Sequence, residues 1–198
     1  MREWCGWSKK KMAKIILGFV GPLAAGKGTA AKYLQEKHGA TIHRFSTMLR
    51  DVANRLYIEQ NRKNLQDLSQ ILREHFGQDL LARVIAEDVK ADQSALVVVD
   101  GVRRHPDIAY LKNIDGFHLV AIAADQKTRF ERMVARGENT DDTSKTFEQF
   151  QRDEQGEAEI HIQEVAADAQ FTVDNNGSRE QLSTQLEKIL TQVNGNQS

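Results

Sequence analysis

The chain has 198 residues, about the size of one domain, and its 27 lysines and arginines nearly balance its 28 aspartates and glutamates. The formal net charge of −1 gives no overall electrostatic reason to expect nucleic acid or an anionic membrane as a partner, although a balanced total is compatible with a local basic cleft. A single cysteine excludes an intrachain disulfide and a cysteine-based metal cluster.

The N-terminal stretch "MREWCGWSKKKMAK" carries charge but lacks the apolar segment of a secretory signal. We expect residues 1–11 to be a tag, an alternative start or a flexible tail, and residues 12–198 to form one domain. No apolar run approaches the ~18 residues of a membrane span. These features predict a cytoplasmic protein with no membrane partner.

Short apolar runs predict five strands, at residues 14–20, 41–45, 95–100, 117–124 and 171–174. Helical spacing predicts helices near 27–37, 126–136, 145–166 and 179–193, and through 46–93, where no strand pattern occurs. One apolar helical face in this last stretch consists of Leu65, Leu68, Ile71, Leu72 and Phe76. The alternation of strands and helices predicts a parallel sheet, with 46–93 inserted at the edge where ligands bind.

The stretch "GPLAAGKGTAAKYL" (21–34) lies where the first strand ends and a helix begins. Gly21 to Lys27 fits the phosphate-binding pattern G-x-x-x-x-G-K in the context that the pattern requires. Glycines let successive backbone amides point at one phosphate, the helix N-terminus adds positive potential, and Lys27 can reach the β- and γ-phosphates. Gly28 stands where this pattern usually has serine or threonine, so the Mg²⁺-binding hydroxyl is displaced to Thr29.

The ending Gly-Lys-Gly-Thr resembles the loops of nucleoside monophosphate kinases, adenylate kinase above all. The resemblance implies ATP and Mg²⁺ as cofactors, with Thr29 as a metal ligand. It also implies nucleotide contacts from the loop and the start of the helix, at Gly21, Ala24, Ala25, Gly26, Lys27, Gly28, Thr29 and Ala30.

The stretch "VVVDGVRRHPDIAYL" (97–111) places Asp100 at the end of the strongest predicted strand, where a carboxylate can hold a Mg²⁺-bound water. It resembles the Asp-Gly-Phe-Pro-Arg segment of adenylate kinase, in which Arg104 is the counterpart of the arginine. It is also similar to the Asp-Gly-x-Arg segment of an archaeal family of nucleotide-kinase-like proteins. In that alignment Arg103 is the counterpart of the family's arginine. Either arginine can grip a phosphate in a bidentate manner, and the sequence leaves both open.

The stretch "FSTMLRDVA" (45–53) resembles the segment Ser-Thr-Gly-Asp-x-Leu-Arg that opens the monophosphate-binding region of the same kinases, although the Gly-Asp pair is missing. The resemblance implies that Ser46 and Arg50 bind the acceptor, and that Arg50 contacts its phosphate.

Arg132 and Arg136 are four residues apart, so they share one helix face and can neutralise a phosphoryl group in transfer. Kinases of this kind carry such arginines around a mobile lid, which implies a small lid at 136–152 with a further arginine at Arg152. Arg129 and Arg152 are equally consistent with a charged, solvated helix.

The tail "ADAQFTVDNNGSREQL" resembles the end of dephospho-coenzyme A kinases and of the archaeal family. In these enzymes the loop after the last strand borders the adenine, which makes Asn175 and Gly177 candidate nucleotide contacts. A tight turn with a glycine at positive φ explains the same residues.

Together these features predict a phosphate-loop (P-loop) NTPase fold, an α/β three-layer sandwich with strand order 2-3-1-4-5. The expected activity is transfer of the γ-phosphoryl group of Mg·ATP to a nucleoside or deoxynucleoside monophosphate, with Lys27, Asp100, Arg132 and Arg136 as catalytic residues. Two alternatives stay open: a dephospho-coenzyme A kinase, whose hydroxyl acceptor needs a base, and a nucleotide-binding switch or assembly factor with slow ATPase activity. We expect small nucleotides as partners, no nucleic acid, and a monomer or homodimer.

Overall fold

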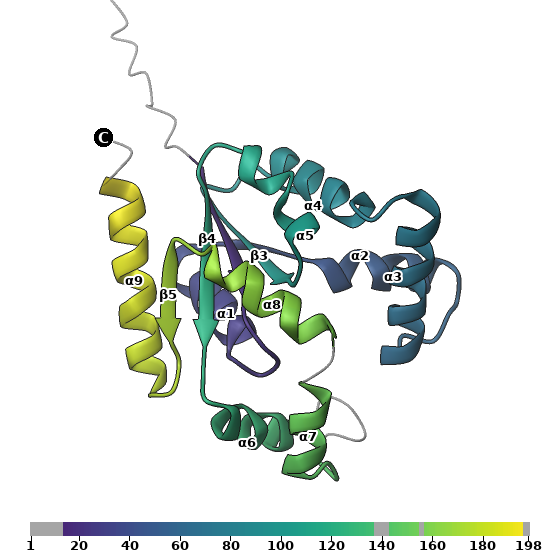
Figure 1. Ribbon diagram of the computed structural model, residues 1–198. Coiled ribbons are helices and arrows are strands. Elements are labelled where there is room, and N and C mark those ends of the chain that lie inside the picture. Colours follow the sequence, from purple (N-terminus) through teal and green to yellow (C-terminus); the bar gives the residue numbers. More distant parts are fainter. Residues whose placement is uncertain (1–13, 137–142, 155–156, 196–198) are drawn as a thin grey trace, which may run out of the picture.

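A five-stranded parallel sheet forms the centre of the computed structural model, which describes residues 14–136, 143–154 and 157–195 (Figure 1). The strands are β1 (Ile15–Val20), β2 (Thr41–Arg44), β3 (Leu96–Val102), β4 (Phe117–Ala123) and β5 (Phe171–Asp174). Their order is β2-β3-β1-β4-β5, and each neighbouring pair is parallel. The predicted strand positions and order are therefore confirmed.

Helices connect the strands in the order that the sequence pattern predicts. They are α1 (Lys27–His38), α2 (Phe45–Arg55), α3 (Arg62–Phe76), α4 (Leu80–Ala91), α5 (His105–Ile108), α6 (Gln126–Arg136), α7 (Phe147–Asp153), α8 (Glu157–Ala167) and α9 (Arg179–Gly195), with a 3₁₀ turn at Leu111–Asn113. The predicted helical stretch 145–166 contains α7 and α8. The short helix α5 and the 3₁₀ turn were not predicted, and Phe45 begins α2 instead of ending β2.

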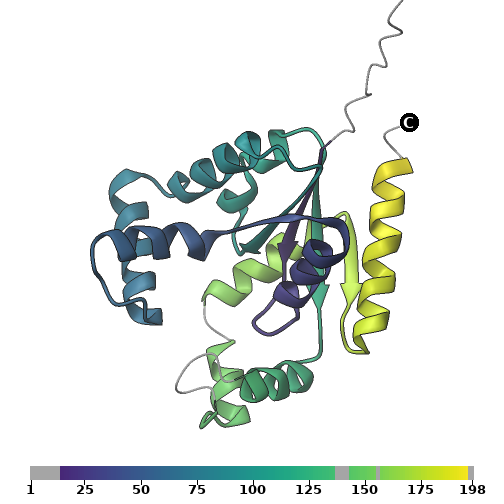
Figure 2. The same cartoon turned by 180° about the vertical axis from the view of Figure 1, so that it is seen from behind.

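Two hydrophobic layers cover the two faces of the sheet. On one face α1 and α9 pack against alternate strand residues such as Leu17 and Val98; α1 lies in front of the sheet in Figure 2. On the other face α4, α5 and α8 pack against the intervening residues, such as Ile16 and Val97. Strands buried on both faces are continuously apolar, which explains the runs "IILGFV" and "LVVV".

The helical insertion divides into a projecting part and a returning helix. In Figures 1 and 2, α2 and α3 stand out to the side of the sheet. They form a small core through Leu49, Ala53 and Leu65, which Leu81 at the start of α4 completes. Helix α4 instead lies on the sheet through Ile85, Ala86 and Val89 and returns the chain to β3.

The predicted apolar face of 65–76 is only partly buried. Leu65 is buried, but Ile71 is 60% exposed and Phe76 is 57% exposed. The projecting helix pair has too few neighbours to cover the whole face. Residues 1–11, expected to be an extension, and residues 137–142 of the expected lid lie outside the described residues. Within the described part, no helix combines the length and hydrophobicity needed to cross a membrane.

Candidate functional site

The phosphate loop, residues 21–27, connects the buried strand β1 to α1. Gly26 has φ +105°, in the left-handed region that favours glycine, and it precedes the first residue of the helix. No side chain among the described residues caps α1 at this end. The first amides of a helix have no partner within the helix, so this N-terminus is suited to bind an anion.

The side chain of Lys27 folds back over the loop. Its Nζ donates to the backbone oxygens of Gly21 at 2.5 Å and Pro22 at 2.9 Å. Ala24, Gly26, Lys27, Gly28 and Thr29 line a large cleft, whereas the other predicted nucleotide contacts in this region do not. These others are Gly21, Ala25 and Ala30, which are buried. The amides of Ala25 and Ala30 already donate to Pro22 O and Gly26 O, so direct contact with a nucleotide is not supported for these residues.

Asn175 lies beneath the loop. Its backbone N–H donates to Ala123 O at 2.8 Å, and its side-chain Nδ2 donates to Ala25 O at 2.7 Å. The residue is only 6% exposed, although it borders the cleft. Asn175 therefore fixes the backbone of the phosphate loop from the end of β5. Gly177 also lines the cleft, and its φ is not positive, so the tight-turn interpretation of this glycine is wrong.

The cleft runs from the phosphate loop to α3 and has a volume of about 2280 Å³. This exceeds the ~300–1,000 Å³ of a pocket for one drug-sized ligand. Eleven lysines and arginines but only four carboxylates line it. The chain as a whole has a net charge of −1, so positive charge is concentrated in this cleft, as anionic ligands require. The eleven basic residues are Lys27, Lys32, Arg44, Arg50, Lys63, Arg73, Arg103, Arg104, Arg132, Arg136 and Arg179.

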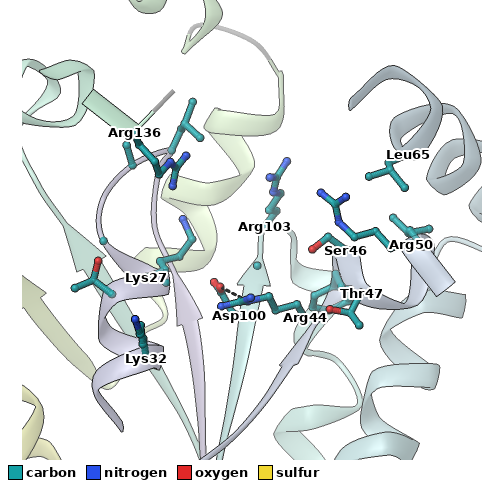
Figure 3. A pocket seen from close by; sticks show the side chains of 18 of the residues that line it. Lys27, Lys32, Arg44, Ser46, Thr47, Arg50, Leu65, Asp100, Arg103 and Arg136 are labelled. Carbon is teal, nitrogen blue, oxygen red and sulfur yellow. Dashed lines mark hydrogen bonds and ion pairs between the residues drawn. The ribbon is translucent and has the colours of Figure 1, made fainter. Parts of the chain in front are cut away.

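Figure 3 shows how the predicted site residues face one another. Lys27 and Arg136 lie on one side of the cleft, Ser46 and Arg50 lie on the other, and Arg103 projects between them. The Nη1 atom of Arg50 donates to Gln60 Oε1 at 3.4 Å. The fold thus brings the loop, the insertion and the segment after β3 to one cavity, although they are far apart in the sequence.

The two candidate arginines after β3 have different surroundings. The carboxylate of Asp107 accepts from the backbone N–H groups of Arg103 and Arg104, both at 3.0 Å, and from Arg104 Nη2 at 3.3 Å. Arg104 Nη1 also lies 3.5 Å from Gln78 Oε1. The guanidinium of Arg103 makes no hydrogen bond or ion pair within the described part of the chain. Arg103 is therefore available to a ligand, whereas Arg104 is held by the protein.

Asp100 forms an ion pair that the sequence analysis missed. Arg44 ends β2 directly beside Asp100 in the sheet, and its Nε donates to Asp100 Oδ2 at 3.2 Å. The Asp100 side chain is 14% exposed and its Oδ1 has no hydrogen bond to the described residues. The predicted strand order already placed 41–45 beside 95–100, so the end of that strand was the signal that pointed to Arg44.

The donor set fits Mg²⁺ bound together with a nucleotide. Among the described residues there is no group of three or more histidines, cysteines or carboxylates that could hold a metal alone. Mg²⁺ in nucleotide sites is usually held by one or two protein oxygens, phosphate oxygens and waters. Thr29 is exposed at the cleft, and Asp100 lies in the same cleft, two residues before the end of β3. These two side chains can supply the protein oxygens.

On α6, Arg132 and Arg136 both line the cleft, as their spacing predicts. The Nη1 atom of Arg132 is buried and lacks a hydrogen-bond partner. A buried guanidinium nitrogen without a partner is unfavourable in the ligand-free protein. It therefore fits a site completed by an anionic ligand such as the phosphates of ATP.

Arg129 is not a solvated helix residue. Its side chain is 8% exposed; Nε donates to Ala124 O at 2.9 Å, Nη1 lies 3.3 Å from Leu23 O, and Nη2 donates to Glu154 Oε2 at 3.0 Å. The guanidinium also lies 5.6 Å from the ring centre of Phe150. Arg129 thus joins the phosphate loop, the end of β4 and the α7 region. Arg152, by contrast, is exposed and does not line the cleft.

Comparison with known proteins identifies the family. A family model described as an AAA domain matches residues 20–151. A UPF0200 protein of Saccharolobus islandicus is 31% identical over 183 residues, which cover 91% of this chain and 94% of the relative. The chain belongs to the UPF0200 family and carries this AAA domain. A UPF0200 protein of Hyperthermus butylicus is 28% identical over 182 residues, covering 92% of this chain and 96% of the relative. The expected relationship to archaeal proteins is confirmed.

Solved structures similar to this UPF0200 chain include shikimate kinases. The enzyme from Bacteroides thetaiotaomicron matches with a TM-score of 0.63 and 14% identity, covering 90% of this chain and 98% of the enzyme. The enzyme from Acinetobacter baumannii, in complex with shikimate, matches with a TM-score of 0.57 and 18% identity, covering 93% and 98%. At these identities the similarity concerns the fold alone. The UPF0200 chain therefore has a P-loop kinase-like fold.

Proposed function

We propose that this protein transfers the γ-phosphoryl group of Mg·ATP to a nucleoside or deoxynucleoside monophosphate. The observation that carries the proposal is one continuous cleft with the phosphate loop on one side, Arg50 on the other, and Arg103 between them. Its volume of about 2280 Å³ and its excess of basic residues are suited to two nucleotides. In-line transfer between two bound phosphates needs such an arrangement.

In this proposal Lys27 and the amides at the start of α1 bind the β- and γ-phosphates. Thr29 and Asp100 would hold Mg²⁺, which would supply positive charge to neutralise the transferring group. Arg132 and Arg136 contribute further positive charge from α6. Arg50, with Ser46 beside it, orients the acceptor from α2. An acceptor that is already a phosphate anion needs no general base, which suits a site whose central carboxylate, Asp100, is paired with Arg44.

A coupled assay for ADP release tests the proposal. ATP is supplied with each of the common ribo- and deoxyribonucleoside monophosphates, with dephospho-coenzyme A, and with no acceptor. We expect ADP release to depend on one or a few of the monophosphates. Release that depends on dephospho-coenzyme A instead would establish the hydroxyl-acceptor alternative. Slow release that no acceptor accelerates would establish the nucleotide switch.

Two lysine variants link the measured activity to the loop. Lys27→Ala should lower phosphoryl transfer by about 100-fold or more, comparable with the loss of one preorganised charge donor. Lys37→Ala is the matched control, because Lys37 is an exposed residue in the last turn of the same helix and does not line the cleft. Transfer near the wild-type rate in Lys27→Ala would contradict the kinase assignment.

A further inference from the structure

Helix α3 presents a polar stripe to the cleft. Gln66, Ser69, Gln70 and Arg73 line the cavity and recur at helical spacing on one face. Leu65, on the same helix, marks the position of α3 in Figure 3, on the Arg50 side of the cleft. No motif in the sequence singles out this stripe, because α3 belongs to the insertion. Two cations line the cleft from this helix, and Lys63 is paired with Asp67, whereas Arg73 has no such pair among the described residues.

The Arg73 guanidinium has no hydrogen bond or ion pair with any residue that the structure describes. The residue is half-buried. Burial lowers the pKa of Arg73, and the nearby positive charge of Arg104 lowers it further. The carboxylates of Asp107 and Glu74 raise this pKa, but they do not offset burial and the like charges, to which Arg103 adds least. Holding a partly desolvated cation next to like charges is unfavourable without a counter-ion. The arrangement is therefore one that a bound anion stabilises.

Asp107, the carboxylate with the larger effect on the pKa of Arg73, is already engaged in hydrogen bonds. Both Asp107 oxygens accept hydrogen bonds, from the backbone of residues 103 and 104 and from the Arg104 guanidinium. Asp107 thus neutralises Arg104 and fixes the turn after β3. Arg73 from α3 and Arg103 from the segment after β3 are left as two guanidiniums with no hydrogen bond or ion pair to a carboxylate among the described residues.

We propose that Arg73 and Arg103 together bind the phosphate of the acceptor, and that Arg104 is a positioning residue held by Asp107. Guanidinium groups present paired N–H donors that match the oxygens of a phosphate monoester, and two of them balance its two negative charges. The inference rests on the proposed function in one respect, since it assumes that the acceptor is phosphorylated. The inference goes beyond the proposed function because it adds Arg73 to the phosphate-binding site and assigns phosphate binding to Arg103 instead of Arg104.

Direct binding measurements test this proposal without relying on turnover. The donor site of the full-length protein is first saturated with Mg²⁺ and a non-hydrolysable ATP analogue. Ribose 5-phosphate, which contains the phosphate but no base, is then titrated by calorimetry, with ribose and acetate as parallel probes. We expect ribose 5-phosphate to bind and the other two probes to bind far more weakly.

Four variants assign the residues. Arg73→Gln and Arg103→Gln should each weaken ribose 5-phosphate binding by about 10- to 100-fold, as expected for the loss of a charged hydrogen-bonding partner. Arg73→Lys, which keeps the charge but loses the paired donors, should be intermediate. Arg55→Gln is the control, because Arg55 lies in the last turn of α2 and does not line the cleft. Affinity for the ATP analogue should stay within about twofold in all four, which shows that the donor site is folded.

The results separate this inference from the proposed function. If Arg73→Gln leaves ribose 5-phosphate binding unchanged while Arg103→Gln weakens it, the role of Arg73 is wrong and the proposed function stands. If the wild-type protein binds acetate as well as ribose 5-phosphate, the site is not selective for phosphate and the inference is overturned. If the wild-type protein binds the ATP analogue but not ribose 5-phosphate, the inference fails together with the phosphorylated acceptor of the proposed function.

Discussion

Two glycines in the phosphate loop region should respond in opposite directions to the same substitution. Gly26 has φ +105°, and a Cβ added there would lie 2.0 Å from Asn175 Nδ2. Gly28 is the second residue of α1, and a Cβ added there would meet none of the described atoms within 4 Å. Alanine at residue 26 must therefore distort the loop or displace Asn175, whereas alanine at residue 28 replaces a glycine within α1 by a better helix former.

The magnitudes follow from these contacts. At Gly26, the left-handed backbone costs alanine about 1–2 kcal/mol. Displacing Asn175 leaves the buried Ala25 carbonyl without its donor, which costs about 1–3 kcal/mol more. Gly26→Ala should therefore lower the free energy of unfolding by about 2–5 kcal/mol, or the melting temperature by about 5–15 °C. Gly28→Ala should raise the free energy of unfolding by about 0.5–1 kcal/mol and the melting temperature by a few degrees.

Circular dichroism melts without nucleotide, supported by urea titrations, measure both effects. The mechanism is tested further in an Asn175→Ala background, where the clash at residue 26 is absent. There Gly26→Ala should cost less than in the wild type, with a coupling energy of about 0.5–3 kcal/mol. The reasoning is refuted if Gly26→Ala is as stable as the wild type, or if both glycine substitutions shift stability in the same direction by similar amounts.

Two further predictions concern stability away from the loop. Burial raises the pKa of Asp92, but hydrogen bonds from His43 and Ser94 lower it more strongly, to about 2. A depressed folded-state pKa stabilises the protein above the unfolded value of 3.8, and this stability is lost as pH falls through about 2. Asp92→Asn should therefore lose about 2 kcal/mol at pH 7 and progressively less between pH 4 and 2, measured by urea unfolding; a difference that does not change with pH would contradict this. Glu154→Ala leaves the buried Arg129 without its carboxylate and should cost about 3–5 kcal/mol. Asp67→Ala, which removes an exposed partner of Lys63, should cost at most about 1 kcal/mol; equal losses in the two variants would show that the Arg129 pair is not effectively buried.

The sequence by itself determined the parts of this protein that depend on local pattern. A continuously apolar run followed by G-x-x-x-x-G-K predicts strand, loop and helix, because each feature is set by neighbouring residues. The spacing of four residues predicts that Arg132 and Arg136 lie on one face of a helix, because this too depends only on residues close in the sequence. The position of Asp100 at the end of a strand predicts its place at the ligand-binding edge, because parallel strands end at a common edge.

The tertiary structure alone decided which charged side chains are paired and which are exposed to a ligand. Arg103 and Arg104 are adjacent and chemically identical, and the positions of Asp107 and Gln78 distinguish them. The sequence is consistent with Arg129 as a solvated surface residue, yet α7 and the phosphate loop pack around its side chain and bury it. Arg73 belongs to no motif, and it lines the same cleft as Arg103 because the insertion brings α3 to one side of that cleft. Burial and charge pairing depend on residues that are distant in the chain, and one helix's own periodicity contains no information about its partners.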